Sequence, residues 1–173
     1  MLIRKANKAD LQGIVDLYSD VHTAEEQGRL TTGWVREIYP VAATAEEALS
    51  RDDIFVEEED GKIVGTCIIN QTQLGAYAEG DWQYDAEPEE VMVLHTLAIE
   101  PFVMHKGYGR RFMEFFEEYA AGRGCRYLRI DTNERNAGAR AFYKRLGYAE
   151  VGVFPWDLGG IPGVRLVLLE KRI

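Results

Sequence analysis

The sequence has few of the residues on which several common enzyme chemistries depend. Its two cysteines, Cys67 and Cys125, lie far apart and lack the spacing of a metal site or a disulfide framework, so we interpret them as ordinary reduced thiols. The only two serines, Ser19 and Ser50, stand outside any Gly-x-Ser-x-Gly context. We therefore predict no metal site and no covalent enzyme intermediate.

Long apolar runs are also missing. No stretch approaches the roughly 20 apolar residues that a membrane-spanning helix needs. Residues 1–6 are too few and too soon polar to form a secretory signal peptide. We expect a cytoplasmic location and no membrane partner.

Positive charge is in deficit, because 20 lysines and arginines stand against 29 acidic residues and the net charge is -9. The basic residues are scattered, which argues against nucleic acid as a partner, since phosphate contacts need basic patches. A cationic partner fits better. Residues 79–90 hold six acidic residues together with Trp82 and Tyr84, and this stretch either attracts an amine or forms a solvated surface.

Familiar nucleotide-binding strings are absent as well. The chain has no Gly-x-x-x-x-Gly-Lys-Ser/Thr sequence, and Phe112 takes the place of the third glycine in a dinucleotide fingerprint. However, Gly107 and Gly109 lie between an apolar, strand-like run and an amphipathic helix. Such glycines let a pyrophosphate approach the free N–H groups of the first helical turn. A plain turn from strand to helix is the alternative.

A second informative segment follows the strand-like residues 127–131. A polar turn leads to Asn136, which is suited to cap a helix, and Gly147 is suited to end that helix. The helix has one apolar face, made by Ala139, Phe142, Tyr143 and Leu146. Tyr143 is therefore expected to point inward, where its hydroxyl needs a partner.

Together the two segments resemble the GNAT superfamily of N-acetyltransferases. That family's acetyl-coenzyme A (acetyl-CoA) loop reads Arg/Gln-x-x-Gly-x-Gly/Ala, and its later motif reads Asn, Ala, Tyr and then Leu-Gly-Phe/Tyr. Within residues 91–153 this chain has, in the same order and spacing, Gly107, Gly109, Asn136, Ala139, Tyr143 and Leu146-Gly147-Tyr148. Met104 departs from the pattern by replacing the leading Arg/Gln. Because the family's loop binds pyrophosphate mainly through backbone N–H groups, this change should lower the match to the motif more than it lowers the affinity for pyrophosphate.

The resemblance implies acetyl-CoA as cosubstrate and a site for it. In the family, the central strand and the next one splay apart, and unpaired backbone groups hold the pantetheine arm. Residues 97–99 occupy that place here, although a continuous buried strand would suit them equally. The implied acetyl-CoA contacts are Leu97, Ala98, Ile99, His105, Lys106, Gly107, Tyr108, Gly109, Arg110, Asn136, Ala139 and Tyr143.

Two residues are candidates for catalysis. Tyr143 matches the family tyrosine that protonates the leaving thiolate, and a phenol suits that role because its pKa lies above that of a thiol. The alternative is a packed tyrosine with a satisfied hydroxyl. His95 lies on the strand that borders the family's reaction centre, where it is a candidate base or water relay. Alternation groups it with Val93 and Leu97, so a hydrogen-bonded core histidine is the alternative.

Strand and helix patterns alternate along the chain. Helices are expected after Asn7, around Trp34 to Tyr39, after a capping-box signature at 44–47, over 107–121 and after Asn136. Strands are expected at 1–6, 54–57, 62–70, 91–99, 127–131, 148–154 and 164–170. With the resemblance, these ranges predict a single domain, 1–173, of α/β (α+β) class. Its GNAT-like fold is a mixed, mostly antiparallel, twisted sheet of about seven strands flanked by helices, with a splayed central pair.

The predicted activity is transfer of an acetyl group from acetyl-CoA to a primary amine of a small molecule or peptide, by direct attack in a ternary complex. A noncatalytic sensor or regulatory module that binds acyl-CoA is the alternative. A longer acyl chain or a hydroxyl acceptor also stays open. The residues do not identify the acceptor amine, because the fold hosts many substrates. The resemblance also implies a homodimer, as is common in the family, and light scattering would test this.

Overall fold

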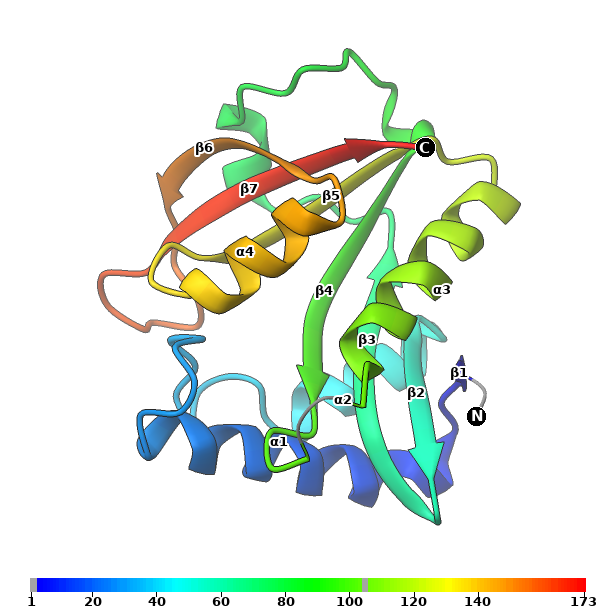
Figure 1. Ribbon diagram of the computed structural model, residues 1–173, viewed down its shortest axis with the longest axis vertical. Coiled ribbons are helices and arrows are strands. Elements are labelled where there is room, and N and C mark those ends of the chain that lie inside the picture. The colour runs from blue at the N-terminus through cyan, green and yellow to red at the C-terminus, as the bar shows by residue number, and fades with distance from the viewer. Residues whose placement is uncertain (1–2, 104–105) are drawn as a thin grey trace.

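The computed structural model describes residues 3–103 and 106–173, which form one seven-stranded sheet with helices on both faces (Figure 1). The strands are β1 (Ile3–Lys5), β2 (Ile54–Glu59), β3 (Lys62–Asn70), β4 (Val91–Ile99), β5 (Tyr127–Asn133), β6 (Ala149–Pro155) and β7 (Arg165–Arg172). Their order in the sheet is β1-β2-β3-β4-β5-β7-β6. Only the β4–β5 pair is parallel, which confirms the predicted mixed, mostly antiparallel sheet.

Four α-helices cover the sheet, two on each face. They are α1 (Leu11–Glu26), α2 (Ala42–Arg51), α3 (Tyr108–Gly122) and α4 (Ala137–Arg145). One apolar layer joins α1 and α2 to the sheet, and a second layer joins α3 and α4 to the other face. Short 3-10 turns occupy residues 8–10, 75–79 and 88–90. In the described part of the chain, no helix is long and apolar enough to cross a membrane.

The segment between α1 and α2 differs from its prediction. Trp34 and Tyr39 lie in an irregular loop rather than on a short helix, because the loop is held by other bonds. The Glu25 carboxylate accepts hydrogen bonds from the backbone N–H groups of Thr32 (2.7 Å) and Gly33 (3.0 Å). Gly33 has a φ of 75°, which no helix contains. Residues 27–41 therefore form an irregular loop, held in place by Glu25, between α1 and α2.

The start of α2 is also shifted from its prediction. The capping-box signature at 44–47 suggested Thr44 as the N-cap, but α2 already begins at Ala42. The hydroxyl of Thr44 instead accepts a hydrogen bond from the N–H of Val41 at 3.1 Å, inside the first turn. The bond satisfies a donor that would otherwise be left over at the helix start.

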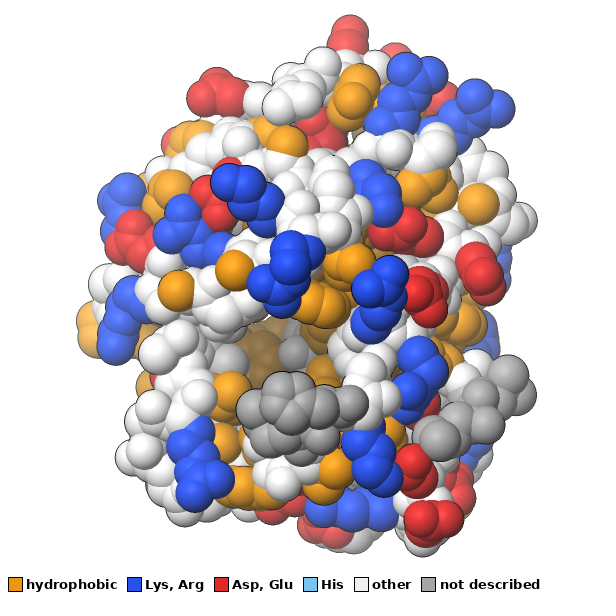
Figure 2. All heavy atoms as spheres, viewed as in Figure 1, with side chains coloured by type: hydrophobic (Ala, Val, Ile, Leu, Met, Phe, Trp, Pro, Cys, Tyr) orange, Lys and Arg blue, Asp and Glu red, His pale blue; other side chains and the backbone are white. Residues whose placement is uncertain are grey.

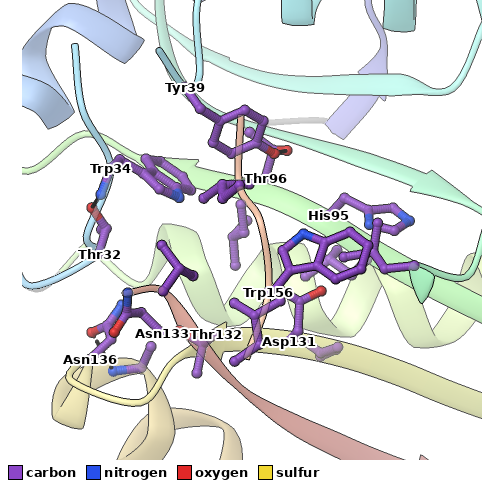
Figure 3. A pocket seen from close by; sticks show the side chains of 18 of the residues that line it. Thr32, Trp34, Tyr39, His95, Thr96, Asp131, Thr132, Asn133, Asn136 and Trp156 are labelled. Atoms are coloured by element: carbon purple, nitrogen blue, oxygen red, sulfur yellow. Dashed lines mark hydrogen bonds between the residues drawn. The ribbon is translucent and has the colours of Figure 1, made fainter. Parts of the chain in front are cut away.

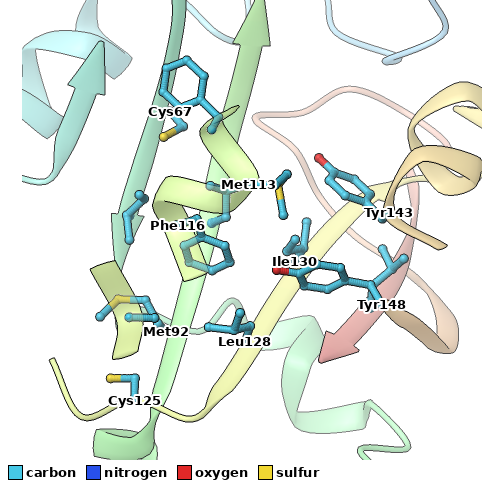
Figure 4. Packing of buried hydrophobic residues seen from close by; sticks show 14 of the residues in the cluster. Cys67, Met92, Met113, Phe116, Cys125, Leu128, Ile130, Tyr143 and Tyr148 are labelled. Carbon is cyan, nitrogen blue, oxygen red and sulfur yellow. The ribbon is translucent and has the colours of Figure 1, made fainter. Parts of the chain in front are cut away.

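The apolar layer beneath α3 and α4 fixes the position of both helices (Figure 4). Phe112 and Phe116 of α3 are fully buried against the sheet, and each such side chain contributes roughly 1.5–3 kcal/mol. Tyr143 of α4 and the neighbouring Tyr148 pack over β5 in the same layer. Cys67 is a buried free thiol here and Cys125 another at the edge. This packing holds both helices against the sheet.

The central strands β4 and β5 part halfway along their length (Figure 1). Their pairing covers Val91–Leu94 of β4 and Tyr127–Ile130 of β5. Beyond these pairs, within the described residues, β4 is paired with β3 alone and β5 with β7 alone. The splayed pair that the resemblance implied is present, and the continuous pairing of β4 with β5 is not.

Candidate active site

A cavity of about 230 Å³ lies where β4 and β5 part. Its lining comes from the loop of residues 27–41, the segment after β3, strands β4 and β5 where they part, helix α4, and the β6–β7 connection with the start of β7 (Figure 3). The lining residues are Thr32, Trp34, Tyr39, Leu74, Leu94, His95, Thr96, Leu97, Ile130, Asp131, Thr132, Asn133, Asn136, Ala139, Tyr143, Trp156, Leu158, Val164 and Leu166.

A β-bulge shapes the open edge of β4. Between the paired residues His95 and Ala98, two residues of β4 oppose the single Cys67 of β3. The first of the two, Thr96, has a φ of 51°, a left-handed conformation that a β-branched residue rarely adopts. Tyr39 and Thr96 share a hydrogen bond between their hydroxyls, which ties the loop of residues 27–41 to the bulge. Backbone groups of β4 after the bulge can therefore pair with an extended ligand.

The start of α3 has the features of an anion cradle. Gly107 is the N-cap with a φ of 75°, and as a glycine it has no side chain to cap the helix. The first N–H groups of a helix lack intrahelical partners and carry the positive end of its dipole. A Cβ built on Gly109 would lie 3.5 Å from Phe142 and 3.9 Å from Ile99, which is ordinary contact. Contacts within the protein therefore do not require a glycine at this position, and a glycine keeps the start of α3 accessible to a ligand.

The same face is hollowed beside the helix starts (Figure 2). Lysine and arginine side chains stand around the hollow, and apolar side chains line its interior. A ligand with an anionic end and an apolar arm is complementary to such a surface.

Three side chains predicted around the glycine loop are engaged within the protein. Lys106 pairs with Glu59 at 2.8 Å, and the buried Tyr108 also donates its hydroxyl to Glu59. Arg110 pairs with Glu114 at 3.0 Å on the exposed side of α3. These residues therefore offer backbone groups rather than free side chains. The predicted contact His105 lies outside the described residues, as does Met104.

The side chains of the three predicted contacts on β4 lie in three different surroundings. Leu97 lines the cavity. Ala98 is buried in the layer under α1, and Ile99 packs against the layer under α3. Their shared contribution to a ligand site is accordingly the backbone edge.

Helix α4 and its N-cap carry the predicted contacts of the second motif. The side chain of Asn136 accepts a hydrogen bond from the N–H of Ala139 at 3.2 Å, which confirms the predicted cap. Asn136, Ala139 and Tyr143 all line the cavity, and their contact with acetyl-CoA stays a prediction.

Tyr143 presents its hydroxyl to the cavity. The residue is 6% exposed, and in the described part of the chain no group hydrogen-bonds its hydroxyl. Burial raises the pKa of Tyr143, and the nearby Asp131 carboxylate raises it further. The phenol therefore stays protonated across the physiological range and is free to donate.

His95 belongs to a hydrogen-bonded network as well as to the cavity wall. Its Nε2 lies 3.1 Å from Oδ1 of Asn70, whose amide nitrogen donates to Asp53 at 2.8 Å. The amide oxygen can only accept, so Nε2 carries the proton and Nδ1 keeps a lone pair. Burial lowers the pKa of His95 to about 4. At neutral pH this imidazole is uncharged and weakly basic.

Asp131 is a cavity residue that the sequence reasoning missed. It lies just beyond the last β4–β5 pair, and one carboxylate oxygen accepts a hydrogen bond from the Tyr77 hydroxyl at 2.8 Å. Burial raises the pKa of Asp131 to about 6, although the Tyr77 bond lowers it. A carboxylate with this pKa can exchange protons near neutrality. The available signal was an acidic residue at the end of a buried strand, five positions before Asn136.

The acidic stretch at residues 79–90 takes no part in this cavity. Trp82 stacks against the Arg129 guanidinium at 3.9 Å, and Tyr84 packs against Tyr127 with ring centroids 5.6 Å apart. The acidic side chains are exposed. The stretch lines a separate, shallow hollow together with Arg129, and its attraction for an amine stays a prediction.

Known proteins resemble the chain in sequence and in structure. A model of the acetyltransferase (GNAT) family matches residues 12–148. An uncharacterized N-acetyltransferase of Methanocaldococcus jannaschii, MJ1207, is 29% identical over 151 residues, which are 86% of this chain and 60% of that protein. The chain thus spans less than two thirds of that relative's length.

Two solved structures share the fold. A GNAT-family acetyltransferase from Streptococcus agalactiae 2603 superposes with a TM-score of 0.80 at 23% identity, covering 99% of this chain and 95% of the other. Salmonella typhimurium yncA, solved with its cofactor acetyl-CoA, gives a TM-score of 0.66 at 19% identity, covering 99% and 92%. The predicted GNAT-like fold is confirmed.

Proposed function

Because the chain belongs to the GNAT family of acetyltransferases, we propose that it transfers the acetyl group of acetyl-CoA to a primary amine of a small molecule or peptide. One observation carries the proposal. The open backbone edge of β4 and the unpartnered hydroxyl of Tyr143 border one cavity, which also holds a carboxylate suited to accept a proton.

Three features of the chain fit acetyl-CoA. The start of α3 and the cations around the hollow suit its phosphates, and the edge of β4 from His95 to Ile99 suits the amide groups of its pantetheine arm. Asn136 and Ala139 at the start of α4 border the same passage. The Salmonella relative of the same fold was solved with acetyl-CoA, which adds support.

Bound acetyl-CoA supplies an activated acetyl group, which the amine nitrogen takes as the bond to the coenzyme sulfur breaks. An ammonium acceptor loses two protons on becoming an amide. Asp131 takes the first proton and passes it to solvent, since its pKa near 6 leaves it mostly ionised at neutral pH. Tyr143 gives its phenolic proton to the departing sulfur, and the second proton from nitrogen restores the phenol. No group of the enzyme is acetylated.

His95 has a lesser role in this scheme. Its pKa of about 4 makes it a poor proton acceptor at neutral pH, whereas the lone pair on Nδ1 can hold a water molecule. We assign it to orienting water on the acceptor side, which is the relay role suggested by its place on β4.

Calorimetric titration of the purified protein with acetyl-CoA, followed by a thiol-release assay with a panel of amines, tests this function. Binding together with amine-dependent thiol release is the expected result. Tight binding with equal thioester turnover in the presence and absence of every amine would favour a noncatalytic acyl-CoA sensor. Absence of binding would remove the basis for the proposal.

A further inference from the structure

The charges that line the cavity select for a cation. Among the described residues, Asp131 is the one lining group that is ionised at neutral pH, and no lysine or arginine lines the cavity. Tyr77 supplies one hydrogen bond to the Asp131 carboxylate, which has further lone pairs to satisfy. A partly buried carboxylate with one neutral donor gains most from a positively charged partner. Asp131 would repel a carboxylate on the ligand, and no lysine or arginine of the described cavity lining would pair with that carboxylate.

Aromatic rings form the walls near this carboxylate. Trp34 and Tyr39 meet edge to face, with ring centroids 5.9 Å apart. Trp156 is placed by close packing on Gly75, where a Cβ would lie only 3.2 Å from the indole ring. Trp34 and Tyr39 come from the loop of residues 27–41 and Trp156 from the β6–β7 connection, and the three rings surround one space with Asp131 (Figure 3). Aromatic faces of this kind attract both apolar skeletons and organic cations.

Two close contacts join the loop of residues 27–41 to neighbouring elements around the cavity. Gly33 approaches Asn133 so closely that a Cβ would lie 2.3 Å from its amide nitrogen. Ile38 meets Gly159 of the β6–β7 connection, where a Cβ would lie 3.0 Å from the Ile38 side chain. The whole cavity, of about 230 Å³, is smaller than the roughly 300–1,000 Å³ of pockets for drug-sized ligands, and the acetyl end of acetyl-CoA would share it with the acceptor. A peptide chain would have to displace these contacts.

We propose that the acceptor is a compact monocationic amine without a carboxylate, whose ammonium group pairs with Asp131 and whose skeleton packs among Trp34, Tyr39 and Trp156. This inference rests on the acetyl transfer proposed above and narrows its substrate class. It distinguishes simple alkyl- and arylalkylamines from α-amino acids and from peptide amino termini.

Matched substrate pairs test the proposal. Phenethylamine and phenylalanine, tyramine and tyrosine, and isoamylamine and leucine differ within each pair by one carboxylate. We expect kcat/KM for the decarboxylated member to be at least about 100-fold higher wherever either member reacts. An amino acid that matches its amine, or an alanine-initiated peptide that surpasses all the amines, would overturn the proposal while leaving acetyl transfer intact. No thiol release with any amine would instead refute the proposed function.

A binding measurement separates recognition from proton transfer. Coenzyme A lacks the acetyl group, so the Kd of the best amine can be measured by calorimetry in its presence without reaction. We expect Asp131→Asn to weaken this Kd at least about 30-fold and Asp60→Asn, an exposed carboxylate outside the cavity, to change it less than about twofold. Amine affinity retained in Asp131→Asn would overturn the role in recognition. Melting temperatures of both variants check folding.

Discussion

The two sides of the gap between β4 and β5 are built in different ways. On the side proposed for acetyl-CoA, the donor side, the groups offered to a ligand are backbone: the start of α3 after Gly107, the edge of β4 and the start of α4 at Asn136. On the side proposed for the amine, the acceptor side, they are side chains from distant segments, among them Trp34, Asp131 and Trp156. A backbone site needs only glycines and caps at fixed spacing, whereas a side-chain site depends on tertiary contacts between loops.

This difference distinguishes a site for a ligand that many enzymes share from a site for an acceptor that is specific to this protein. The donor side suits one ligand that many enzymes share, and it shows in the sequence as contiguous motifs. The acceptor side can change its ligand through one substitution in a loop without disturbing the fold. Substitutions on the two sides should therefore affect different measured quantities.

The largest effect is expected from Asp131→Asn on the acceptor side. We expect kcat/KM for the amine to fall about 1,000-fold, because the variant has neither a charge for the ammonium group nor a proton acceptor. In the wild type, the carboxylate is protonated below its pKa of about 6, so the rate should rise with pH through about 6. Steady-state assays from pH 5 to 8 test this, and an unchanged rising limb in the variant would exclude Asp131 as the base.

The next effect belongs to the donor side. Gly109→Leu should weaken acetyl-CoA binding about 100-fold, because its side chain extends into the anion cradle while the Cβ itself has room in the protein. Gly122→Leu, at the open far end of the same helix, is the matched control and should bind normally. Calorimetry with both variants measures the contrast. Equal affinity in the two would place the coenzyme elsewhere.

Tyr143 lies where the two sides meet, so its substitution should change the rate without changing coenzyme affinity. Tyr143→Phe removes only the hydroxyl, and we expect kcat to fall about 30-fold while the Kd for acetyl-CoA stays within about twofold. Tyr148→Phe is the control, since its hydroxyl lies toward Glu117, 3.4 Å away, and outside the cavity. A full rate in Tyr143→Phe would make Tyr143 a packing residue.

Asp131 should also lower the stability of the fold, which no donor-side backbone group does. Its folded pKa of about 6 lies above the unfolded value near 3.9, so the folded state binds more protons between these pH values and loses stability as pH rises through them. Asp131→Asn keeps the acceptor for Tyr77 and should be up to about 2–3 kcal/mol more stable at pH 7.5, but not at pH 4. Urea unfolding at both pH values measures this, and a destabilised variant at pH 7.5 would contradict it.

The smallest effect is expected at His95. His95→Gln keeps a donor for Asn70, and we expect kcat/KM to fall less than about 10-fold, because an imidazole with a pKa of about 4 transfers few protons at neutral pH. A loss of about 100-fold or more would restore His95 as the general base and remove that role from Asp131.

Sequence reasoning succeeded where the signal is local. The glycines before α3, the cap at Asn136 and the inward Tyr143 all follow from short spacings, and the structure places them as predicted. The carboxylate of Asp131 and the ring of Trp34 gave no such signal, because their meeting depends on a splayed sheet and a folded loop. A short helix was expected around Trp34, since the bonds from Glu25 that hold this loop are not visible in the local pattern.

A crystal structure of the protein with coenzyme A bound would show whether the gap between β4 and β5 holds the donor. We expect the diphosphate on the first N–H groups of α3, the pantetheine arm along β4 from His95 to Ile99, and the sulfur close to the Tyr143 hydroxyl. Coenzyme A bound outside the gap between β4 and β5, or with its sulfur far from Tyr143, would contradict this expectation.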